Sequence, residues 1–386
     1  MKNILLLGGS GSIGTQTIDV IDKYNSRFNL TGISVGNRTE ILEELIKKYA
    51  NLNYFCLKNQ KDYLYFKNKY PDKRFYYGDE GLLKIINECP CDMVVNALIG
   101  FVGFLPTIEC LKLNKILCLS NKESLVVGGE IVNKYLKEGK GKLYPIDSEH
   151  VAIAKCLYGK SSEDIDKILI TASGGPFFFY EKDQFKNITP ELALNHPTWK
   201  MGKKITIDSS TMMNKCFEII EAHYLFDVPG DKIEPIVDRK SHVHSMVKFK
   251  NGDIYLQVGP SDMRIPIYYA LNEGKCDNGA IFEDVEINTF DKYKFFEMDY
   301  EKFPLIKYAW ECLKIGGNYG AVLNAANEVL VNAFLNNEIN YITIQTILDK
   351  IMKAYSFMEA PSVEDLVKTD LEVRKLTKEY ITKDAI

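Results

Sequence analysis

The sequence lacks any excess of positive charge. Its 48 Lys and Arg residues are outnumbered by 52 Asp and Glu residues, which leaves a net charge of -4. Such a chain has no basic excess with which to neutralise a phosphate backbone. We therefore expect no nucleic acid partner, and any phosphate that the protein binds should belong to a small molecule.

Long apolar segments are also missing at the start of the chain. The apolar run at residues 4–7 leads at once into glycines. This run is too short for the apolar region of a secretory signal or for a membrane span. We expect a cytoplasmic protein with no membrane partner.

Cysteine is present but lacks a metal-binding or disulfide pattern. The nine cysteines form no paired CxxC framework, and the closest two, Cys89 and Cys91, have the wrong spacing for a zinc site or a thioredoxin-like motif. Reduced, mostly buried thiols are the expectation.

What is present is a chain of 386 residues, 46% of them hydrophobic, which is long enough for two or three domains. Over residues 1–147, short apolar runs alternate with helical stretches, which predicts an N-terminal Rossmann-like, doubly wound parallel sheet of the α/β class. The apolar runs are 3–7, 30–35, 93–97, 116–120 and 143–146, and the helical stretches include 13–24, 39–50 and 104–113.

The rest of the chain has a different pattern of predicted strands and helices. Residues 148–272 predict an α+β domain with a hairpin about Asn251 and Gly252. The polar segment 273–300 is expected to be a linker, and residues 301–386 a small C-terminal helical domain. The strand-like runs are 167–171, 236–237, 244–249 and 253–258, and the helical spacing is clearest at 321–335 and 343–357.

A glycine-rich segment at residues 9–14, reading GSGSIG, follows an apolar run and opens a helix. This context is typical of a dinucleotide pyrophosphate site. About twenty residues on, where an NAD enzyme has an acid for the ribose, the chain reads Gly36-Asn37-Arg38. A guanidinium pairs with a 2′-phosphate, so we expect NADPH. Alternatively, Arg38 is a solvated cation and Glu40 binds the ribose.

Two carboxylates follow the last apolar run of the first part. In extended backbone Asp147 and Glu149 project to one side, and two converging carboxylates require a cation. Oxygen ligands favour Mg²⁺ or Mn²⁺. The alternative is a helix N-terminus with a capping residue and an acid in its first turn.

A second polar segment, residues 207–218, reads as a strand end, a cap and a helix. Asn214, Lys215 and Glu218 then share one helix face, which carries an amide, an ammonium and a carboxylate. Alternatively, Lys215 and Glu218 form only a surface ion pair.

Two loops complete the candidate site. Residues 171–176, reading TASGGP, follow an apolar run and leave hydroxyl and N–H groups open to an anion. Residues 196–204 carry Trp199 in a polar loop, as in a lid that excludes water. The alternatives are a plain Gly-Gly-Pro turn and a domain-packing tryptophan. Three of the five histidines fall in these polar segments, namely His150, His196 and His244, whereas His223 and His242 read as structural.

Taken together, these motifs closely resemble the 1-deoxy-D-xylulose 5-phosphate reductoisomerase family. The resemblance covers essentially the whole chain in order. Its segments are GGSGSIG at 8–14, NKES at 121–124, DSEH at 147–150, TASGGPF at 171–177, HPTWKMG at 196–202, DSSTMMNK at 208–215, HSMV at 244–247, DMRIPI at 262–267 and NAANE at 324–328.

The resemblance implies a reaction and an assembly. The reaction is the NADPH-dependent conversion of 1-deoxy-D-xylulose 5-phosphate to 2-C-methyl-D-erythritol 4-phosphate in the non-mevalonate isoprenoid pathway, with Mg²⁺ or Mn²⁺. The implied assembly is a homodimer, with the domain at 148–272 holding the metal site, the lid and the dimer contacts.

The resemblance also implies a role for each matching residue. The metal ligands are Asp147, Glu149 and Glu218. The substrate residues are Lys122, Ser148, Glu149, Ser173, His196, Trp199, Ser209, Asn214, Lys215 and Glu218, with Ser173, Ser209, Asn214 and Lys215 on the phosphate and Trp199 as the lid. The cofactor residues are Ser10, Gly11, Ser12, Ile13, Gly36, Asn37, Arg38, Asn121, Glu123 and Gly202. The catalytic set is Lys122, Glu149, His150, His196 and Glu218.

Some positions depart from the family pattern. Asn37 and Arg38 reverse the usual order of a basic residue and Asn, so the partner of the 2′-phosphate stays open. Residues 238–240 read Asp-Arg-Lys where the family has His-Pro-Gln, and Pro260-Ser261 replaces an acid and a proline. We expect these replacements near the site but not in contact with substrate.

Two rival functions remain at this point. A simple NADPH dehydrogenase would leave Asp147, Glu149 and Glu218 with structural roles only. A non-catalytic NADPH sensor predicts a damaged metal or phosphate set, and the sequence shows no such damage. The residue that transfers the proton and the choice between a retro-aldol route and an acyl shift stay open.

Overall fold

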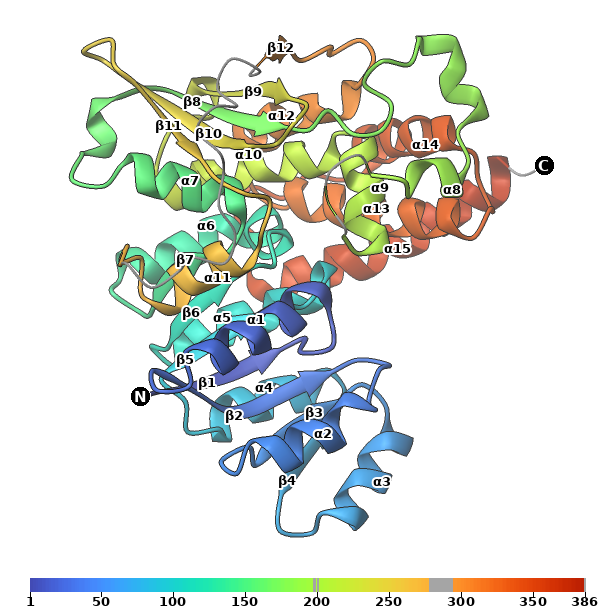
Figure 1. Cartoon of the computed structure of the whole chain (residues 1–386). Helices are drawn as coiled ribbons and strands as arrows, with labels where there is room; N and C mark the ends of the chain where they lie inside the picture. Colours follow the sequence, from blue (N-terminus) through green and yellow to red (C-terminus); the bar gives the residue numbers. More distant parts are fainter. Residues whose placement is uncertain (197–198, 200, 278–293, 385–386) are drawn as a thin grey trace. The chain divides into compact units, whose positions relative to one another are not determined.

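The computed structural model describes residues 1–196, 199, 201–277 and 294–384. These residues form two compact units (Figure 1). Of the described residues, 1–124, 131–148 and 262–277 belong to the first unit, and the others belong to the second. The chain therefore returns to the first unit after residue 261, whereas the boundaries expected at 147, 272 and 300 follow the sequence order.

The first unit contains a seven-stranded sheet in the order β4-β3-β2-β1-β5-β6-β7, and all of its strand pairs are parallel. The order runs outward from β1 in both directions, so the predicted Rossmann-like, doubly wound sheet is confirmed. The strands are β1 Lys2–Leu7, β2 Phe28–Val35, β3 Tyr54–Leu57, β4 Arg74–Tyr77, β5 Met93–Asn96, β6 Ile116–Leu119 and β7 Lys142–Pro145.

Helices cover this sheet, as parallel strands require. The last four residues of β1, Ile4–Leu7, have no exposed surface, which explains their uninterrupted apolar run. The expected elements did not include β3, α3 or β4, and α3 was missed because it buries only Phe66 and so lacks helical periodicity. The helices are α1 Ser12–Lys23, α2 Ile41–Lys48, α3 Gln60–Lys69, α4 Gly78–Glu88, α5 Phe104–Lys112, α6 Glu123–Lys137 and α11 Arg264–Leu271, with a 3₁₀ turn at Gly100–Gly103. Residues 125–130 of α6 belong to the second unit.

The second unit is built on a five-stranded sheet in the order β11-β10-β8-β9-β12. Strands β8 and β9 are parallel and the other pairs are antiparallel, so the α+β prediction is confirmed. The predicted hairpin joins β10 to β11, and Gly252 takes the positive φ of +94° that such a turn requires. The strands are β8 Ile165–Ala172, β9 Ile233–Asp238, β10 Val243–Phe249, β11 Ile254–Val258 and β12 Phe295–Glu297.

Strand β12 lies inside the segment 273–300 that the sequence predicted to be a linker, and it pairs with β9. Residues 278–293 of that segment lie outside the described part of the chain. What the structure shows of the expected linker is therefore partly sheet.

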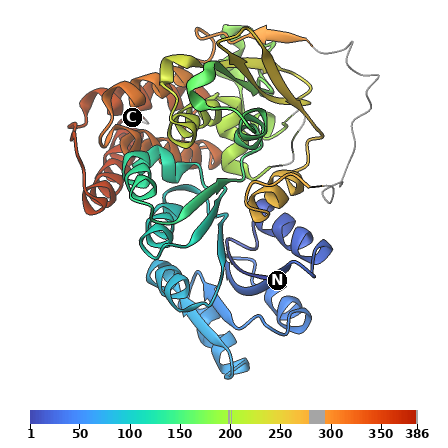
Figure 2. The ribbon, with the colours of Figure 1, turned by 90° about the vertical axis from the view of Figure 1, so that its left-hand side faces the viewer.

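Helices make up the rest of the second unit, and the predicted C-terminal helical region is confirmed (Figure 1 and Figure 2, red). Helix α13 packs against α14 and α15, and Leu323, Leu330 and Phe334 are buried in the core. The helices are α7 Ser148–Cys156, α8 Pro190–Ala193, α9 Lys203–Ser210, α10 Met213–Phe226, α12 Tyr308–Ile315, α13 Tyr319–Leu335, α14 Tyr341–Ala354 and α15 Val363–Asp384, with 3₁₀ turns at Ser162–Asp164, Lys182–Asn187, Gly230–Lys232 and Pro304–Lys307.

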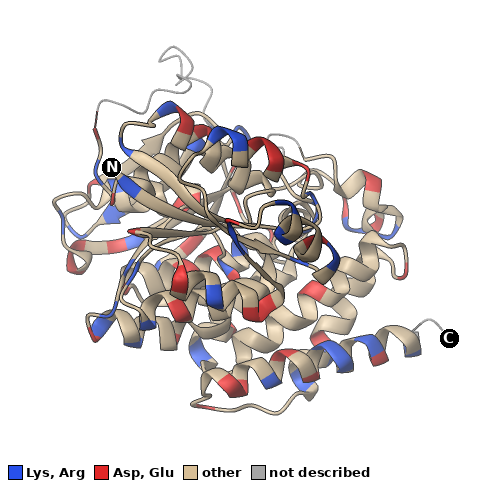
Figure 3. Ribbon diagram, turned by 90° about the horizontal axis from the view of Figure 1, so that it is seen from below, with Lys and Arg blue, Asp and Glu red and all other residues tan. Residues whose placement is uncertain are grey.

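The charges, the helix lengths and the cysteines of the described residues agree with the expectations from composition. Acidic and basic residues are interspersed along α15, the helix that leads to the C-terminus (Figure 3). Within the described residues, every helix is too short or too polar to cross a bilayer. All nine cysteines are free thiols and seven of them are buried, as predicted.

Candidate active site

The glycine-rich loop follows β1 in the first unit and is closed by its own backbone. Gly11 N donates to Gly8 O at 2.9 Å, and Gly8 has a φ of +86°. A Cβ on Gly14 would lie 2.2 Å from Gly8 O, so only glycine fits there. Helix α1 begins directly after Gly11 and presents its N-terminus, which favours an anion. Residues 10–13 therefore have the backbone geometry of a pyrophosphate site.

Neighbouring strand ends bring other predicted cofactor residues to the same edge of the sheet. Gly36 N, after β2, donates to Ser10 Oγ at 3.3 Å. Asn37 and Arg38 are exposed beyond it. After β6, Asn121 Nδ2 donates to Glu123 Oε2 at 3.1 Å. The predicted set thus lies along the carboxyl edge of this sheet, except for Gly202, which belongs to the second unit.

An ion pair joins the ends of β6 and β7 in the first unit. Lys122 Nζ lies 2.6 Å from Asp147 Oδ2, and only 6% of Lys122 and 9% of Asp147 are exposed. Removing either partner of such a buried pair leaves an uncompensated charge, which is expensive. The predicted substrate lysine is therefore held in place by a predicted metal ligand.

A second buried charge cluster lies in the second unit around Lys215 of α10. Its ammonium donates to Glu149 Oε1 at 3.3 Å, to Glu218 Oε2 and to the carbonyl of Thr171. Asn214 Nδ2 also donates to Glu218, at 2.5 Å from its Oε1. Because only 3% of Lys215 and 1% of Glu218 are exposed, the alternative of a surface ion pair is wrong.

Two local expectations about these segments are also wrong. Helix α7 begins at Ser148, so Glu149 lies in a first helical turn and not in extended backbone. An acid is favoured at that helix end, as the alternative reading held. Residues 203–210 form α9 where a strand end was expected, and the chain then turns sharply at Met212, whose φ is +64°.

The turn between α9 and α10 brings three predicted substrate residues together. His196 Nε2 lies 3.1 Å from both Ser173 Oγ and Ser209 Oγ. Its Nδ1 accepts a hydrogen bond from Trp199 N at 3.0 Å, so Nε2 carries the proton of the neutral ring. Burial, aided by the charge of Arg239, lowers the pKa of His196 to about 4. The ring is therefore neutral at pH 7.

The lid is only partly described, because Pro197, Thr198 and Lys200 lie outside the described residues. Trp199 is half-buried, and its ring centroid lies 6.3 Å from that of His244. Whether this loop closes over a substrate stays a prediction.

His150 has no exposed surface. Its Nε2 lies 2.9 Å from the carbonyl oxygen of Glu218, and its Nδ1 lies 3.4 Å from Glu221 Oε2. Both ring nitrogens thus face α10 of the same unit. This geometry suits a residue that positions Glu218 better than one that touches substrate.

Sequence reasoning missed residues that hold the site in place. Arg239 donates from Nη1 to the carbonyls of Ser173 and Gly175. Asn327 of α13 donates to the buried Asp208 of α9 at 2.8 Å. The available signals were the departure from the family pattern at Arg239 and the polar residues Asn324 and Asn327 in the mostly apolar helix α13.

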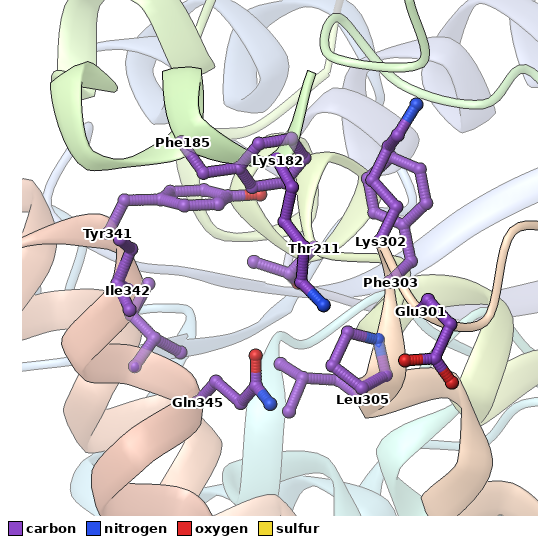
Figure 4. Close-up of a pocket in the computed structure, with 12 residues that line it drawn as sticks. Lys182, Phe185, Thr211, Glu301, Lys302, Phe303, Leu305, Tyr341, Ile342 and Gln345 are labelled. Atoms are coloured by element: carbon purple, nitrogen blue, oxygen red, sulfur yellow. The ribbon is translucent and has the colours of Figure 1, made fainter. Parts of the chain in front are cut away.

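A separate cavity of about 150 Å³ lies in the second unit beside α14 (Figure 4). Its walls include Phe185, Phe303, Leu305 and Tyr341, and none of the predicted site residues lines it. Its closest link to the site is Thr211, at the turn after α9. The candidate site is therefore defined by the strand and helix ends above and not by this cavity.

Three family models match the chain. The model described as 1-deoxy-D-xylulose 5-phosphate reductoisomerase matches residues 4–129. The model of that enzyme's C-terminal domain matches residues 143–226, and the model described as DXP reductoisomerase C-terminal domain matches residues 258–376.

Curated relatives match along the full length. The chain is 41% identical over 387 residues to the 1-deoxy-D-xylulose 5-phosphate reductoisomerase of Clostridium kluyveri, covering 99% of this chain and 100% of the relative. It is 43% identical over 382 residues to the same enzyme of Clostridium novyi, covering 98% of this chain and 99% of the relative.

Solved structures share the fold. A crystal structure of DOX-P reductoisomerase in complex with NADPH, fosmidomycin and magnesium aligns with a TM-score of 0.92 at 32% identity, covering 99% of this chain and 98% of that one. The Zymomonas mobilis enzyme in complex with NADPH aligns with a TM-score of 0.90 at 33% identity, covering 98% and 99%.

Proposed function

The chain belongs to the 1-deoxy-D-xylulose 5-phosphate reductoisomerase family, and we propose that its described residues divide the work of that reaction as follows. The reaction converts 1-deoxy-D-xylulose 5-phosphate to 2-C-methyl-D-erythritol 4-phosphate with NADPH and a divalent cation. The observation that carries the assignment of residues is the buried cluster of Lys215 with Glu149 and Glu218. A plain dehydrogenase has no need of such a cluster.

The donor set of this cluster fits a divalent cation. Glu149 and Glu218 offer carboxylate oxygens within 4.8 Å of each other, and hard oxygen ligands suit Mg²⁺ or Mn²⁺. Asp147 precedes Glu149 by two residues and completes the proposed set of ligands. A bound cation supplies Lewis-acid stabilisation of negative charge on substrate oxygens. His150, through the carbonyl of Glu218, keeps this part of α10 in place.

The first unit fits the dinucleotide. Its glycine loop and the N-terminus of α1 receive the pyrophosphate, and the exposed Arg38 and Asn37 offer a guanidinium and an amide to a 2′-phosphate. NADPH supplies the hydride that reduces the rearranged aldehyde. We assign cofactor contacts to Ser10, Gly11, Ser12, Ile13, Gly36, Asn37, Arg38, Asn121, Glu123 and Gly202.

The hydroxyl and amide groups of the second unit suit the substrate phosphate. Ser173 and Ser209 flank the neutral His196, and Asn214 and Lys215 add an amide and an ammonium. Binding energy from this non-reacting group helps to hold the sugar during the reaction. We assign sugar contacts to Lys122, Ser148, Glu149 and Glu218 and the covering role to Trp199.

Proton transfer at the sugar oxygens falls to Lys122 and Glu149 in this proposal. Each is a titratable group in the proposed sugar-contacting set, and each is held by a charged partner, Asp147 for Lys122 and Lys215 for Glu149. Geometry of this kind fixes a proton donor or acceptor before substrate arrives.

The test follows NADPH absorbance with 1-deoxy-D-xylulose 5-phosphate and Mn²⁺. Glu218→Gln keeps the size of the side chain and removes its charge, so we expect a loss of at least about 100-fold in kcat, the effect of removing one charge-stabilising group. The exposed Glu379→Gln on α15 is the matched control and should retain wild-type activity. Substrate-dependent oxidation that survives both a chelator and Glu218→Gln would falsify the proposed metal site.

We also propose a homodimer that uses the edge strand β11. Its residues Ile254, Tyr255 and Leu256 are 52%, 40% and 46% exposed, and exposed apolar edge strands are normally covered by a partner. Sedimentation should give twice the chain mass of 44.1 kDa. Ile254→Lys with Leu256→Lys should give monomer, and Leu371→Lys, on an exposed leucine of α15, should not. A monomeric wild type contradicts this proposal.

A cytoplasmic location and a three-part chain, divided near residues 147, 272 and 300, complete the proposal. Free thiols throughout favour a reducing compartment. Limited proteolysis with mass mapping tests the division, and cleavage confined to sites far from these positions contradicts it.

A further inference from the structure

Two parallel strands of the second unit place an arginine beside the proposed phosphate loop. In the register of β8 and β9, Ala172 pairs with Val237. The segments that follow these strands, 173–175 after β8 and 239–240 after β9, therefore leave the sheet at the same edge. Arg239 is the second residue after Val237, so strand pairing itself brings it to the loop that carries Ser173.

Arg239 is bound to that loop by hydrogen bonds and ring contacts. Its Nη1 donates to Gly175 O at 2.7 Å and to the carbonyl of Ser173. Its guanidinium carbon lies 5.5 Å from the ring centroid of Phe178 and 5.4 Å from that of Phe179. An arginine can make these contacts together because its planar fork offers several donors and a flat face.

The turn that carries Arg239 is itself fixed. Asp238 is 1% exposed, and its carboxylate accepts hydrogen bonds from the backbone N–H groups of Lys240, His242 and Val243 at 3.0, 3.1 and 3.0 Å. The carboxylate of Asp238 therefore stabilises the turn through these three hydrogen bonds. Within the described residues Arg239 has no ion pair, so its positive charge is not neutralised by a neighbour.

The positive charge of Arg239 affects the electrostatics of a proposed substrate residue, His196. It contributes, after burial, to the lowered pKa of His196, whose ring lies between the hydroxyls of Ser173 and Ser209. Burial also lowers the pKa of Arg239, because no carboxylate compensates its partial desolvation. A dianionic ligand near Ser173 would supply the missing negative charge.

We propose that Arg239 is a positioning residue for the substrate phosphate: it ties back the carbonyls of Ser173 and Gly175 and adds uncompensated positive charge beside them. Because Arg239 binds these two carbonyl oxygens, their partial negative charges do not repel the phosphate. The hydroxyl of Ser173 can then donate a hydrogen bond to the phosphate. The inference deepens the proposed function and rests on it. It is particular to this chain, since Arg239 stands in a segment that departs from the family pattern.

The test compares Arg239→Met with Arg239→Lys and with the control Lys240→Met. Met keeps an apolar stem against Phe178 and Phe179 and removes the charge, Lys keeps the charge without the fork, and Lys240 is an exposed cation next in sequence. Each variant is assayed for kcat, for KM of both substrates, for melting temperature and for the dissociation constant of inorganic phosphate.

We expect Arg239→Met to raise the KM for the sugar phosphate and the dissociation constant of phosphate about tenfold, the effect of losing one charged contact. The KM for NADPH should stay constant and kcat should change less than about threefold, because the hydride step is not touched. Arg239→Lys should fall between Met and wild type, and Lys240→Met should match wild type.

A purely structural role for Arg239 predicts a different outcome. It lowers the melting temperature and affects both substrates alike, or it leaves phosphate affinity unchanged, and either result overturns the inference. Calorimetric titration of phosphate needs no turnover, so it still tests Arg239 if the wild type proves inactive on 1-deoxy-D-xylulose 5-phosphate. Failure of the proposed function would thus be distinguished from failure of this inference.

Discussion

The two units hold their site residues by different means. In the first unit the glycine loop is shaped by the backbone of neighbouring residues, as in the bond from Gly11 N to Gly8 O. In the second unit Lys215 meets Glu149 and the carbonyl of Thr171, which are 66 and 44 residues away in sequence. A site formed by local backbone should tolerate the loss of a side chain but not the addition of an atom. A buried ionic site should be destabilised when either charged partner is removed.

The largest expected effect is on the ionic site. Lys215→Met takes the ammonium from two acids, Glu149 and Glu218, and breaking a buried pair costs about 3–5 kcal/mol. Denaturant unfolding at pH 7 with a chelator measures this loss. In the control, Lys248→Met removes an exposed pair to Asp166, in which the side chains are 42% and 39% exposed, and should cost about 1 kcal/mol or less. Equal losses in the two variants would remove the distinction between buried and exposed pairs.

A pH effect should come next, and it should belong to the second unit, which contains all five histidines. Burial lowers the pKa of His244 to about 4, against 6.5 for an unburied ring. The unfolded chain therefore binds more protons between these values, so this stability is complete above about pH 6.5 and is lost as the pH falls to about 4.

His244→Gln should reduce the loss of unfolding free energy between pH 7 and pH 4 by up to about 3 kcal/mol. Calorimetric melts across this pH range provide the measurement. His196, whose pKa burial also lowers to about 4, should contribute in the same direction, but less because it is only partly buried whereas His244 is buried. If His244→Gln keeps the full wild-type loss, burial of this ring does not set the acid sensitivity.

The glycine loop should respond to an added methyl group. A Cβ on Gly14 would meet Gly8 O at 2.2 Å, whereas a Cβ on Gly36 would meet nothing within 4 Å. Gly14→Ala should therefore lower stability by about 1–3 kcal/mol. Gly36→Ala should stay within about 0.5 kcal/mol. Thermal unfolding without cofactor compares them, and similar melting temperatures would show that the loop can open.

The smallest effect should be on cofactor choice. Arg38 is exposed, so losing its contact to the 2′-phosphate should lower the preference for NADPH over NADH only about tenfold in Arg38→Ser. Asn37→Ser should change it less, because an amide lacks charge. The ratio of kcat/KM with NADPH to kcat/KM with NADH measures this preference in each variant. A larger effect at Asn37 would identify its amide as the partner of the 2′-phosphate. An effect of Glu40→Gln alone would instead favour the alternative in which Glu40 binds the ribose and Arg38 is a solvated cation.

By itself, the sequence determined the elements whose signals are local. The alternation of apolar runs and helices predicted the parallel sheet, because the apolar pattern of each element is local even though its strands pair with distant ones. GSGSIG predicted the loop after β1, because backbone hydrogen bonds within a few residues close that loop. The local structure around Asp147 and at residues 207–218 was misread. Helix α7 starts earlier and α9 replaces a strand end, because helix-end and strand-end signals are similar in short polar segments.

Only the tertiary structure decided which charges are buried and what holds them. Sequence spacing allowed Lys215 and Glu218 to be a surface pair, and burial in the second unit excluded it. The contact of Arg239 with the loop at Ser173 depends on the pairing of β8 with β9, strands that begin 68 residues apart. Burial and strand register are properties of the packed chain, because they depend on which distant segments exclude water together.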